Sequence, residues 1–111
     1  MTKEELLQTR RIIEDEIAAL QNLRQTTRDS RAPVELDQQS VGRLSRMDAL
    51  QKQSMELATE TRRQQRLAAL RAALGRLEAG EYGACISCGE DIAPARLAID
   101  VAVTRCIGCM D

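Results

Sequence analysis

Four cysteines form the clearest chemical pattern in this 111-residue sequence. They fall into two Cys-x-x-Cys pairs, Cys85 with Cys88 and Cys106 with Cys109, which are separated by seventeen residues. Two such pairs at this separation fit one tetrahedral zinc ion that is bound by four thiolates. We therefore predict one structural zinc ion with all four cysteines as its ligands.

Paired cysteines also form disulfides or redox-active pairs, and the sequence leaves these alternatives open. Disulfides are typical of secreted proteins, yet Met1-Thr2-Lys3-Glu4-Glu5 does not resemble a signal peptide. A thioredoxin-type redox pair would lie in a βαβ pattern, which is absent here. A zinc hydrolase needs an open coordination position, and four cysteine ligands would leave none. We accordingly expect no enzymatic activity.

The composition favours long helices over a large globular core. Tyr82 is the only aromatic residue, 43% of the residues are hydrophobic and 30% are charged. This mixture is typical of amphipathic helices in a chain of one domain, or of one domain with a long projection. No apolar run approaches the roughly 20 residues of a membrane span. We expect a soluble, cytoplasmic monomer.

The first segment predicts an amphipathic helix from Thr2 to about Arg28. Thr2 and Glu5 have the spacing of a capping box, in which each side chain binds the backbone N–H of the other residue. The apolar residues that follow recur at helical spacing. We expect one packed face formed by Leu6, Ile13, Ile17 and Leu20 and widened by Ile12 and Leu23.

A second, longer helix is predicted from about Gln38 to Glu78. It follows a loop over residues 29–36, because Pro33 disfavours helix at the residue before it. Residues 59–66 are too polar for a tightly packed seam, and we expect an apolar stripe on either side of them. The first stripe comprises Leu44, Met47, Leu50 and Leu57, and the second comprises Leu67, Leu70, Leu74 and Leu77.

These elements predict a mainly α fold, in which an antiparallel two-helix coiled-coil hairpin over residues 1–79 precedes a small C4 zinc finger over residues 80–111. Gly80 is suited to end the second helix. Within the finger we expect Ile92, Leu97 and Ile99 to pack around the metal. Pro94 should shape the chain between the two cysteine pairs.

The residues around the cysteines resemble the DksA/TraR family of zinc-finger transcription regulators. The first pair is entered through Gly-x-Tyr-Gly-x-Cys, an Arg-Leu pair lies between the cysteine pairs, and a helical hairpin precedes the finger as in the longer, DksA-like members. The resemblance is specific over residues 80–109 and architectural over residues 1–79. The residues that carry it are Gly80, Tyr82, Gly83, Cys85, Cys88, Gly89, Ile92, Arg96, Leu97, Cys106 and Cys109.

The resemblance implies a non-enzymatic regulator that binds bacterial RNA polymerase directly. In this family the coiled coil enters the secondary channel of the polymerase, and its tip lies near the catalytic centre. Initiation is thereby modulated, often together with the alarmone ppGpp in the stringent response. The resemblance places the tip of the present hairpin at about residues 29–48.

The tip of this sequence departs from the family pattern of two aspartates and an alanine. It offers Asp48 and Ala49, with Asp37 as the other available acid. We expect Asp48 to be the functional acid. Arg43 and Arg46 are expected to contact the channel or nucleic acid.

The resemblance also predicts weak binding of ppGpp. Arg62 stands where the family has one basic contact, and Arg96 is a further candidate contact with polymerase or ppGpp. Gln65 and Ala69 stand in place of two lysines, and Asp100 in place of an arginine. Because a multiply charged anion needs several cationic donors, the composite ppGpp site is incomplete here.

An autonomous nucleic-acid-binding zinc finger is the alternative function. Residues 41–80 carry eight basic and four acidic side chains, whereas residues 81–111 carry two basic and five acidic ones. The finger therefore lacks the basic and aromatic side chains that contact phosphates and stack on bases. We expect no sequence-specific binding to DNA.

Overall fold

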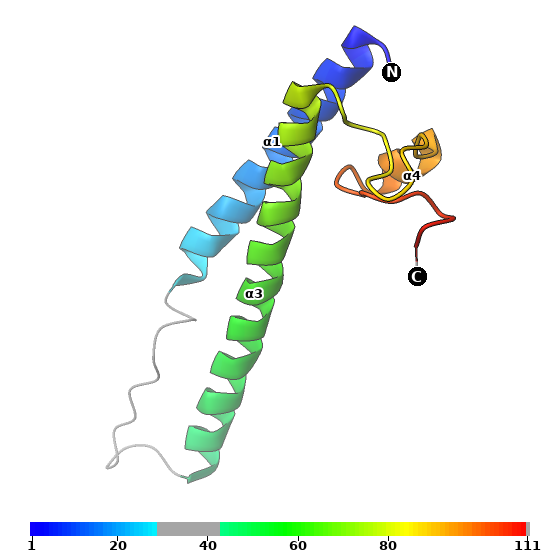
Figure 1. The fold of residues 1–111 in the computed structure, drawn as a ribbon. Coiled ribbons are helices and arrows are strands. Elements are labelled where there is room, and N and C mark those ends of the chain that lie inside the picture. Colours follow the sequence, from blue (N-terminus) through cyan, green and yellow to red (C-terminus); the bar gives the residue numbers. More distant parts are fainter. Residues whose placement is uncertain (29–42, 111) are drawn as a thin grey trace. The chain divides into compact units, whose positions relative to one another are not determined.

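The computed structural model describes residues 1–28 and 43–110, without the side chains of residues 43–45. This part contains three helices, α1 (Lys3–Thr26), α3 (Arg43–Ala79) and α4 (Pro94–Ile99) (Figure 1). Its one β-type pairing is an isolated bridge between Ala84 and Asp91. The predicted mainly α fold with two long helices is confirmed. The predicted loop over residues 29–36 and the predicted helix start near Gln38 lie outside the described residues.

α1 begins with the predicted capping box. The backbone N–H of Thr2 donates to the Glu5 carboxylate over 3.3 Å, and the N–H of Glu5 donates to Thr2 Oγ1 over 3.1 Å. Near the other end, the hydroxyls of Thr26 and Thr27 donate to the carbonyl of Leu23. The capping box satisfies two backbone N–H groups that a helix start leaves without a partner, whereas the Leu23 carbonyl also accepts the backbone N–H of Thr27.

The end of α3 is set by Gly80, as predicted. Gly80 has φ 75°, a backbone conformation that glycine adopts without steric cost. Its N–H donates to the carbonyl of Leu77, and the N–H of Glu81 donates to the carbonyl of Arg76 over 2.8 Å. This pair of bonds is the Schellman arrangement, which turns the chain out of the helix.

Contacts divide the chain into two units. The terminal unit joins Met1–Ala18 to Leu67–Asp111, and the middle unit comprises Ala19–Arg66. α1 and α3 contribute residues to both units. None of the helices in the described part is long and apolar enough to cross a membrane.

In the terminal unit the helices pack through apolar side chains. Arg10 Nη2 lies 2.9 Å from Glu78 Oε1, which pairs the start of α1 with the end of α3 and makes the two helices antiparallel. Ile13, Leu67, Leu70 and Ala73 are almost completely buried. Leu74 and Leu77 are half-buried, so the predicted second stripe of α3 is confirmed.

In the middle unit the seam between the helices is polar. Glu60 is only 4% exposed, and its carboxylate pairs with Arg24 of α1 and Arg63 of α3. Arg63 Nη1 also donates to Thr27 Oγ1 over 3.1 Å. The expectation that residues 59–66 are too polar to pack was therefore wrong, because complementary charges and a hydroxyl satisfy one another there.

The register of α3 also corrects the predicted first stripe. Buried and half-buried residues recur along α3 at alternating steps of three and four, the spacing of a coiled-coil seam: Arg46, Ala49, Gln53, Glu56, Glu60, Arg63, Leu67, Leu70, Leu74 and Leu77. Met47, Leu50 and Leu57 each follow a seam residue by one position, which turns them about 100° away from the partner helix. They are 58%, 46% and 47% exposed. The side chain of Leu44 is not among those described.

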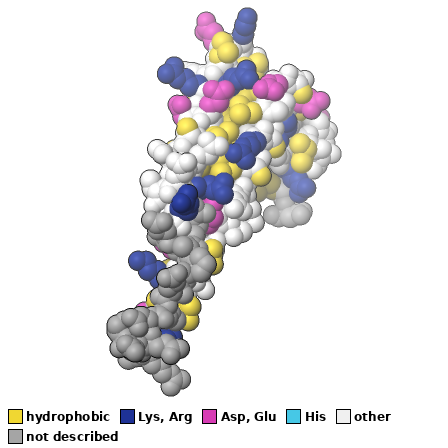
Figure 2. Space-filling view, turned by 90° about the vertical axis from the view of Figure 1, so that its left-hand side faces the viewer, with side chains coloured by type: hydrophobic (Ala, Val, Ile, Leu, Met, Phe, Trp, Pro, Cys, Tyr) yellow, Lys and Arg dark blue, Asp and Glu magenta, His cyan; other side chains and the backbone are white. Residues whose placement is uncertain are grey.

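Two residues of the predicted packed face of α1 also lie outside the seam. Ile12 and Leu23 are about half exposed and do not widen the packed face as predicted, whereas Leu6, Ile17 and Leu20 are half-buried. Figure 2 shows hydrophobic side chains at the molecular surface among charged side chains of both signs. Apolar surface is therefore left for contacts beyond the seam.

Candidate metal centre

The first cysteine pair lies at a tight turn in a short hairpin-like segment. Ala84 and Asp91 form the isolated bridge, the N–H of Ile92 donates to the carbonyl of Gly83, and the N–H of Cys85 donates to the carbonyl of Glu90. Gly89 has φ 79°, and its N–H donates to the carbonyl of Cys85 over 2.9 Å. A glycine directly after Cys88 thus lets the backbone fold back behind the two sulfurs.

The second cysteine pair forms a turn of its own. The N–H of Cys109 donates to the carbonyl of Cys106 over 3.0 Å. The N–H of Ile86, between the cysteines of the first pair, donates to the carbonyl of Thr104, just before the second pair. This backbone bond holds the two turns against each other although they are far apart in sequence.

The four sulfur atoms form one cluster that fits a zinc ion. The Sγ atoms of Cys85, Cys88, Cys106 and Cys109 all lie within 4.8 Å of one another, and those of Cys88 and Cys106 are 3.7 Å apart. Zn–S bonds of about 2.3 Å in a tetrahedron place neighbouring sulfurs roughly 3.8 Å apart. The predicted zinc ligands therefore meet at the spacing that a C4 zinc site requires. This is the one cluster of three or more metal-ligating side chains in the described part of the chain.

The hydrogen bonds of the cluster already favour a thiolate at one position. The backbone amide of Cys106, followed by those of Cys88 and Ser87, lowers the pKa of Cys85 to about 6 despite its burial. Hydrogen bonds with the thiols of Cys106, Cys88 and Cys85 raise the pKa of Cys109 to about 12. Without a cation the cluster cannot hold four negative charges, and a divalent metal ion supplies the compensating charge.

A small apolar core supports the metal cluster. Cys85, Ile92 and Leu97 are buried together, and Tyr82 and Val103 pack against them. Pro94 is the first residue of α4, a position that suits proline because its missing N–H has no helical partner there. Ile92 and Leu97 pack as predicted. Ile99 is 88% exposed, so its predicted place in the core was wrong.

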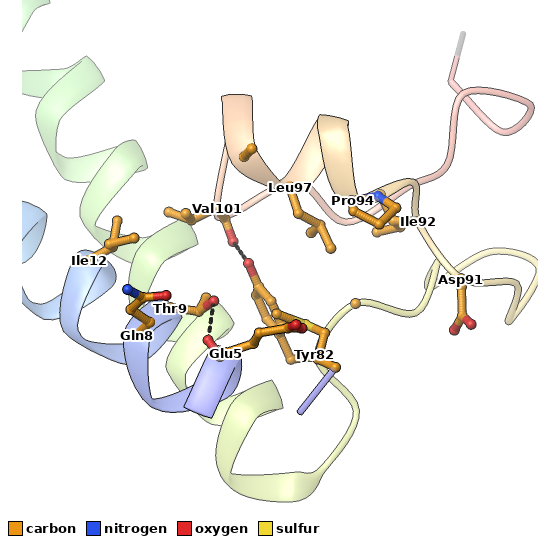
Figure 3. A pocket seen from close by; sticks show the side chains of 13 residues that line it. Glu5, Gln8, Thr9, Ile12, Tyr82, Asp91, Ile92, Pro94, Leu97 and Val101 are labelled. Atoms are coloured by element: carbon orange, nitrogen blue, oxygen red, sulfur yellow. Dashed lines mark hydrogen bonds between the residues drawn. The ribbon is translucent and has the colours of Figure 1, made fainter. Parts of the chain in front are cut away.

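The only aromatic ring of the chain closes this core. The hydroxyl of Tyr82 donates to the carbonyl of Val101 over 2.8 Å, across the turn that follows α4 (Figure 3). Burial raises the pKa of Tyr82, and this effect outweighs the opposite effect of the nearby Arg76. The ring therefore remains a neutral donor and links the entry of the finger to its far side.

The metal cluster is structural by its chemistry. Four cysteine ligands complete the tetrahedral shell of zinc and leave no position at which water could be activated. The four sulfur donors would hold the two turns together around the ion.

The other predicted site residues lie outside the metal cluster. Asp48 is exposed on α3, whereas Arg46 and Ala49 occupy half-buried seam positions. Arg43 is the first residue of α3, and Asp37 lies outside the described residues. Arg62 is exposed and donates to Thr59 Oγ1 over 3.2 Å.

Arg96 and Asp100 are engaged within the finger. Arg96 Nη2 donates to the carbonyl of Arg105 over 3.1 Å, and Asp100 Oδ1 accepts the N–H of Ala102 over 3.0 Å. The Arg96 bond ties α4 to the residue that directly precedes the second cysteine pair. A cavity beside α1 was not foreseen from the sequence, because its two walls are about 80 residues apart and no local pattern joins them.

Comparisons with known proteins agree with this geometry. Residues 80–110 match the model of the prokaryotic dksA/traR C4-type zinc finger. None of the curated proteins matches the sequence. The solved structure of transcription factor DksA2 from Pseudomonas aeruginosa has a TM-score of 0.79 and 24% sequence identity, and the match covers 97% of this chain and 81% of that one. Residues 80–110 therefore match a C4-type zinc finger of the dksA/traR kind, and the chain as a whole shares the fold of the DksA2 structure.

Proposed function

We propose that the protein binds bacterial RNA polymerase in the cytoplasm and modulates the initiation of transcription. One observation carries the proposal: the likeness to transcription factor DksA2 extends over 97% of the chain and so includes hairpin and finger together. In this proposal residues 1–79 form the hairpin that enters the secondary channel, and residues 80–111 form the finger. A role in the stringent response belongs to the same proposal.

The proposed functional acid is Asp48. It lies in the second turn of α3 and is exposed, so its carboxylate can contact a partner without first breaking a contact within the protein. Arg46 and Ala49 would position the same turn from the seam. A side chain near the tip of a hairpin is held by a helical scaffold, which favours precise placement at a partner's site.

The first experiment combines retention on core RNA polymerase with transcription in vitro. Wild-type protein should be retained and should change the yield from a stable-RNA promoter. Asp48→Asn should lose most of the regulation while affinity changes by less than about twofold, since one exposed charge contributes little to stability or binding. Asp15→Asn, an equal change at an exposed position of α1, is the matched control. A wild-type protein that polymerase does not retain would exclude the proposed function.

The proposal includes a weak dependence on ppGpp at the interface with polymerase. Arg62 offers a single exposed guanidinium, and an exposed ion pair contributes at most about 1 kcal/mol. Transcription should therefore respond equally with and without ppGpp, when the polymerase lacks its other ppGpp site. Strong synergy that disappears in Arg62→Ala would contradict this part of the proposal.

A further inference from the structure

A groove lies between one face of α1 and the finger, within the terminal unit (Figure 3). Its volume is about 580 Å³, within the range of sites that bind ligands or anchor side chains. Glu5, Gln8 and Ile12 line one wall, and Tyr82, Asp91 and Val101 line the other. We call this cavity the α1–finger groove.

The walls of the groove are held by contacts that do not depend on an occupant. The hydrogen bond from the Tyr82 hydroxyl to the carbonyl of Val101 fixes the aromatic wall. Ile92 and Leu97, which also line the groove, belong to the buried core of the finger. On α1 the capping box holds Glu5 at the start of the helix. Each wall of the groove is therefore fixed within its own segment of the chain.

The side-chain charges of the groove have one sign, and the one cation among its lining residues is the N-terminal amino group of Met1. Glu5 and Asp91 are its only ionisable carboxylates, and no Lys or Arg is among its lining residues. The side chains of Gln8 and Asp91 have no hydrogen-bond or ion-pair partner among the described residues. An apolar floor with unpaired acceptors at its rim is complementary to an apolar group next to a cation.

The groove is open to solvent on the side of α1. Ile12 lines it and is still 52% exposed, and Met1, another lining residue, is 59% exposed. A site for a free small molecule usually buries most of the ligand. A surface groove with exposed apolar residues instead suits a side chain that a larger partner inserts.

We propose that the α1–finger groove binds a protein segment in which an apolar side chain stands next to a Lys or Arg, and that this segment belongs to RNA polymerase. The apolar side chain would pack between Ile12 and Tyr82, and the cation would face Asp91 and Glu5. The inference rests on the proposed function and adds a second anchoring surface to the hairpin tip. In this inference the groove strengthens the binding to RNA polymerase, whereas Asp48 acts in the regulation of initiation.

Two exposed residues of the groove allow tests with matched controls. Asp91→Lys reverses the charge at the rim, and Glu90→Lys makes the same change at the preceding exposed residue outside the groove. Ile12→Ser removes an apolar contact, and Leu7→Ser does so on the same helix at a residue that is 58% exposed and does not line the groove. Zinc content and helical circular dichroism verify that each variant is folded.

The measurement is the Kd of each variant for core RNA polymerase at low and moderate salt. Asp91→Lys and Ile12→Ser should each weaken binding about tenfold, the effect of losing one well-placed interface side chain. The effect of Asp91→Lys should shrink as salt rises, because salt screens exposed charges. The two controls should stay within about twofold of wild type.

The outcomes separate this inference from the proposed function. If wild type binds polymerase and the groove variants match their controls, the groove does not hold the segment and the inference is overturned, while the proposed function stands. If wild type itself is not retained, the proposed function fails and the inference fails with it. Weak binding by the groove variants together with intact controls supports both.

Discussion

The two units of this protein use one coiled-coil spacing with opposite chemistry. In the terminal unit the seam buries Ile13, Leu67 and Leu70, and the zinc cluster completes the unit. In the middle unit the corresponding seam positions carry Glu60 and Arg63, and the Glu60 carboxylate pairs with both Arg63 and Arg24. The comparison shows that heptad spacing sets which residues face the partner helix, whereas the composition of those positions sets how much the contact stabilises the fold.

The difference predicts unequal stability along the hairpin. Burial of an apolar side chain contributes about 1.5–3 kcal/mol. A buried ion pair recovers little more than the cost of removing its charges from water. Regions with few buried apolar contacts open at lower free energy than the rest of a protein. The middle unit should therefore exchange its amide hydrogens faster than the terminal unit.

The largest expected effect comes from removal of zinc. Structural zinc contributes on the order of 10 kcal/mol to the folding of small domains. Chelation should unfold the finger, while the middle unit, which lacks metal ligands, keeps its helical signal. Hydrogen exchange by residue range and circular dichroism measure both. Cys88→Ser should reproduce the effect, and a protein with less than one equivalent of zinc and oxidised thiols would contradict the assignment of the site.

Truncation in the apolar seam should have the next largest effect. Leu70→Ala leaves a cavity at a fully buried position and should cost about 2–5 kcal/mol of unfolding free energy. Leu57→Ala, at a residue that is 47% exposed, should cost less than about 0.5 kcal/mol. Urea denaturation of both variants tests the register of α3. Equal costs would mean that the heptad positions are assigned wrongly.

Changes in the polar seam should be smaller and depend on what replaces the charges. Glu60→Ala leaves Arg63 and Arg24 without the carboxylate and should cost about 1–3 kcal/mol. Replacing Arg24, Glu60 and Arg63 together by leucine should restore or raise stability, because a packed apolar cluster often equals a buried ion pair. Arg10→Ala breaks two exposed pairs, with Glu14 and Glu78, and should cost at most about 1 kcal/mol. A triple variant less stable than Glu60→Ala would show that the polar seam is required.

The smallest effect concerns Tyr82 and depends on pH. Tyr82→Phe removes the hydrogen bond to Val101 and should cost about 0.5–1.5 kcal/mol near neutral pH. Burial raises the pKa of Tyr82 above its ordinary value of 10.0, so the folded protein holds the phenolic proton longer than the unfolded chain. This contribution is fully present below pH 10 and is lost as pH rises through the folded pKa. The wild type should therefore lose more stability above pH 10 than Tyr82→Phe does.

The sequence predicted the elements whose signals are local. The paired cysteines indicated zinc, Thr2 and Glu5 indicated the start of α1, and Gly80 indicated the end of α3 because each signal depends on a few neighbouring residues. Leu67, Leu70, Leu74 and Leu77 were placed correctly because steps of three and four residues put all four apolar side chains on one face of a helix.

The wrong predictions for α3 concern places where charged residues occupy seam positions and apolar residues stand outside the seam. Met47, Leu50 and Leu57 are apolar but stand one residue after the seam, while the seam itself carries Glu60 and Arg63. Hydrophobicity alone could not separate these sets, since the charges of the seam are satisfied by a partner on the other helix. Ile99 was misplaced because the end of α4 turns it towards solvent. The α1–finger groove depends on contacts between distant segments, which no local pattern encodes.

The terminal unit joins residues Met1–Ala18 to Leu67–Asp111, and this affects the order in which the chain can fold as it is synthesised. Arg24 and Glu60 are 36 residues apart in the chain, whereas Arg10 and Glu78 are 68 apart. On the ribosome the middle unit is complete once Arg66 has emerged, but Ile13 has no apolar seam to join until Leu67 and Leu70 follow. The zinc site waits longer still, for Cys109. A chain that emerges from its N-terminus can therefore close the less stable middle unit before the apolar seam and the zinc site of the terminal unit are complete.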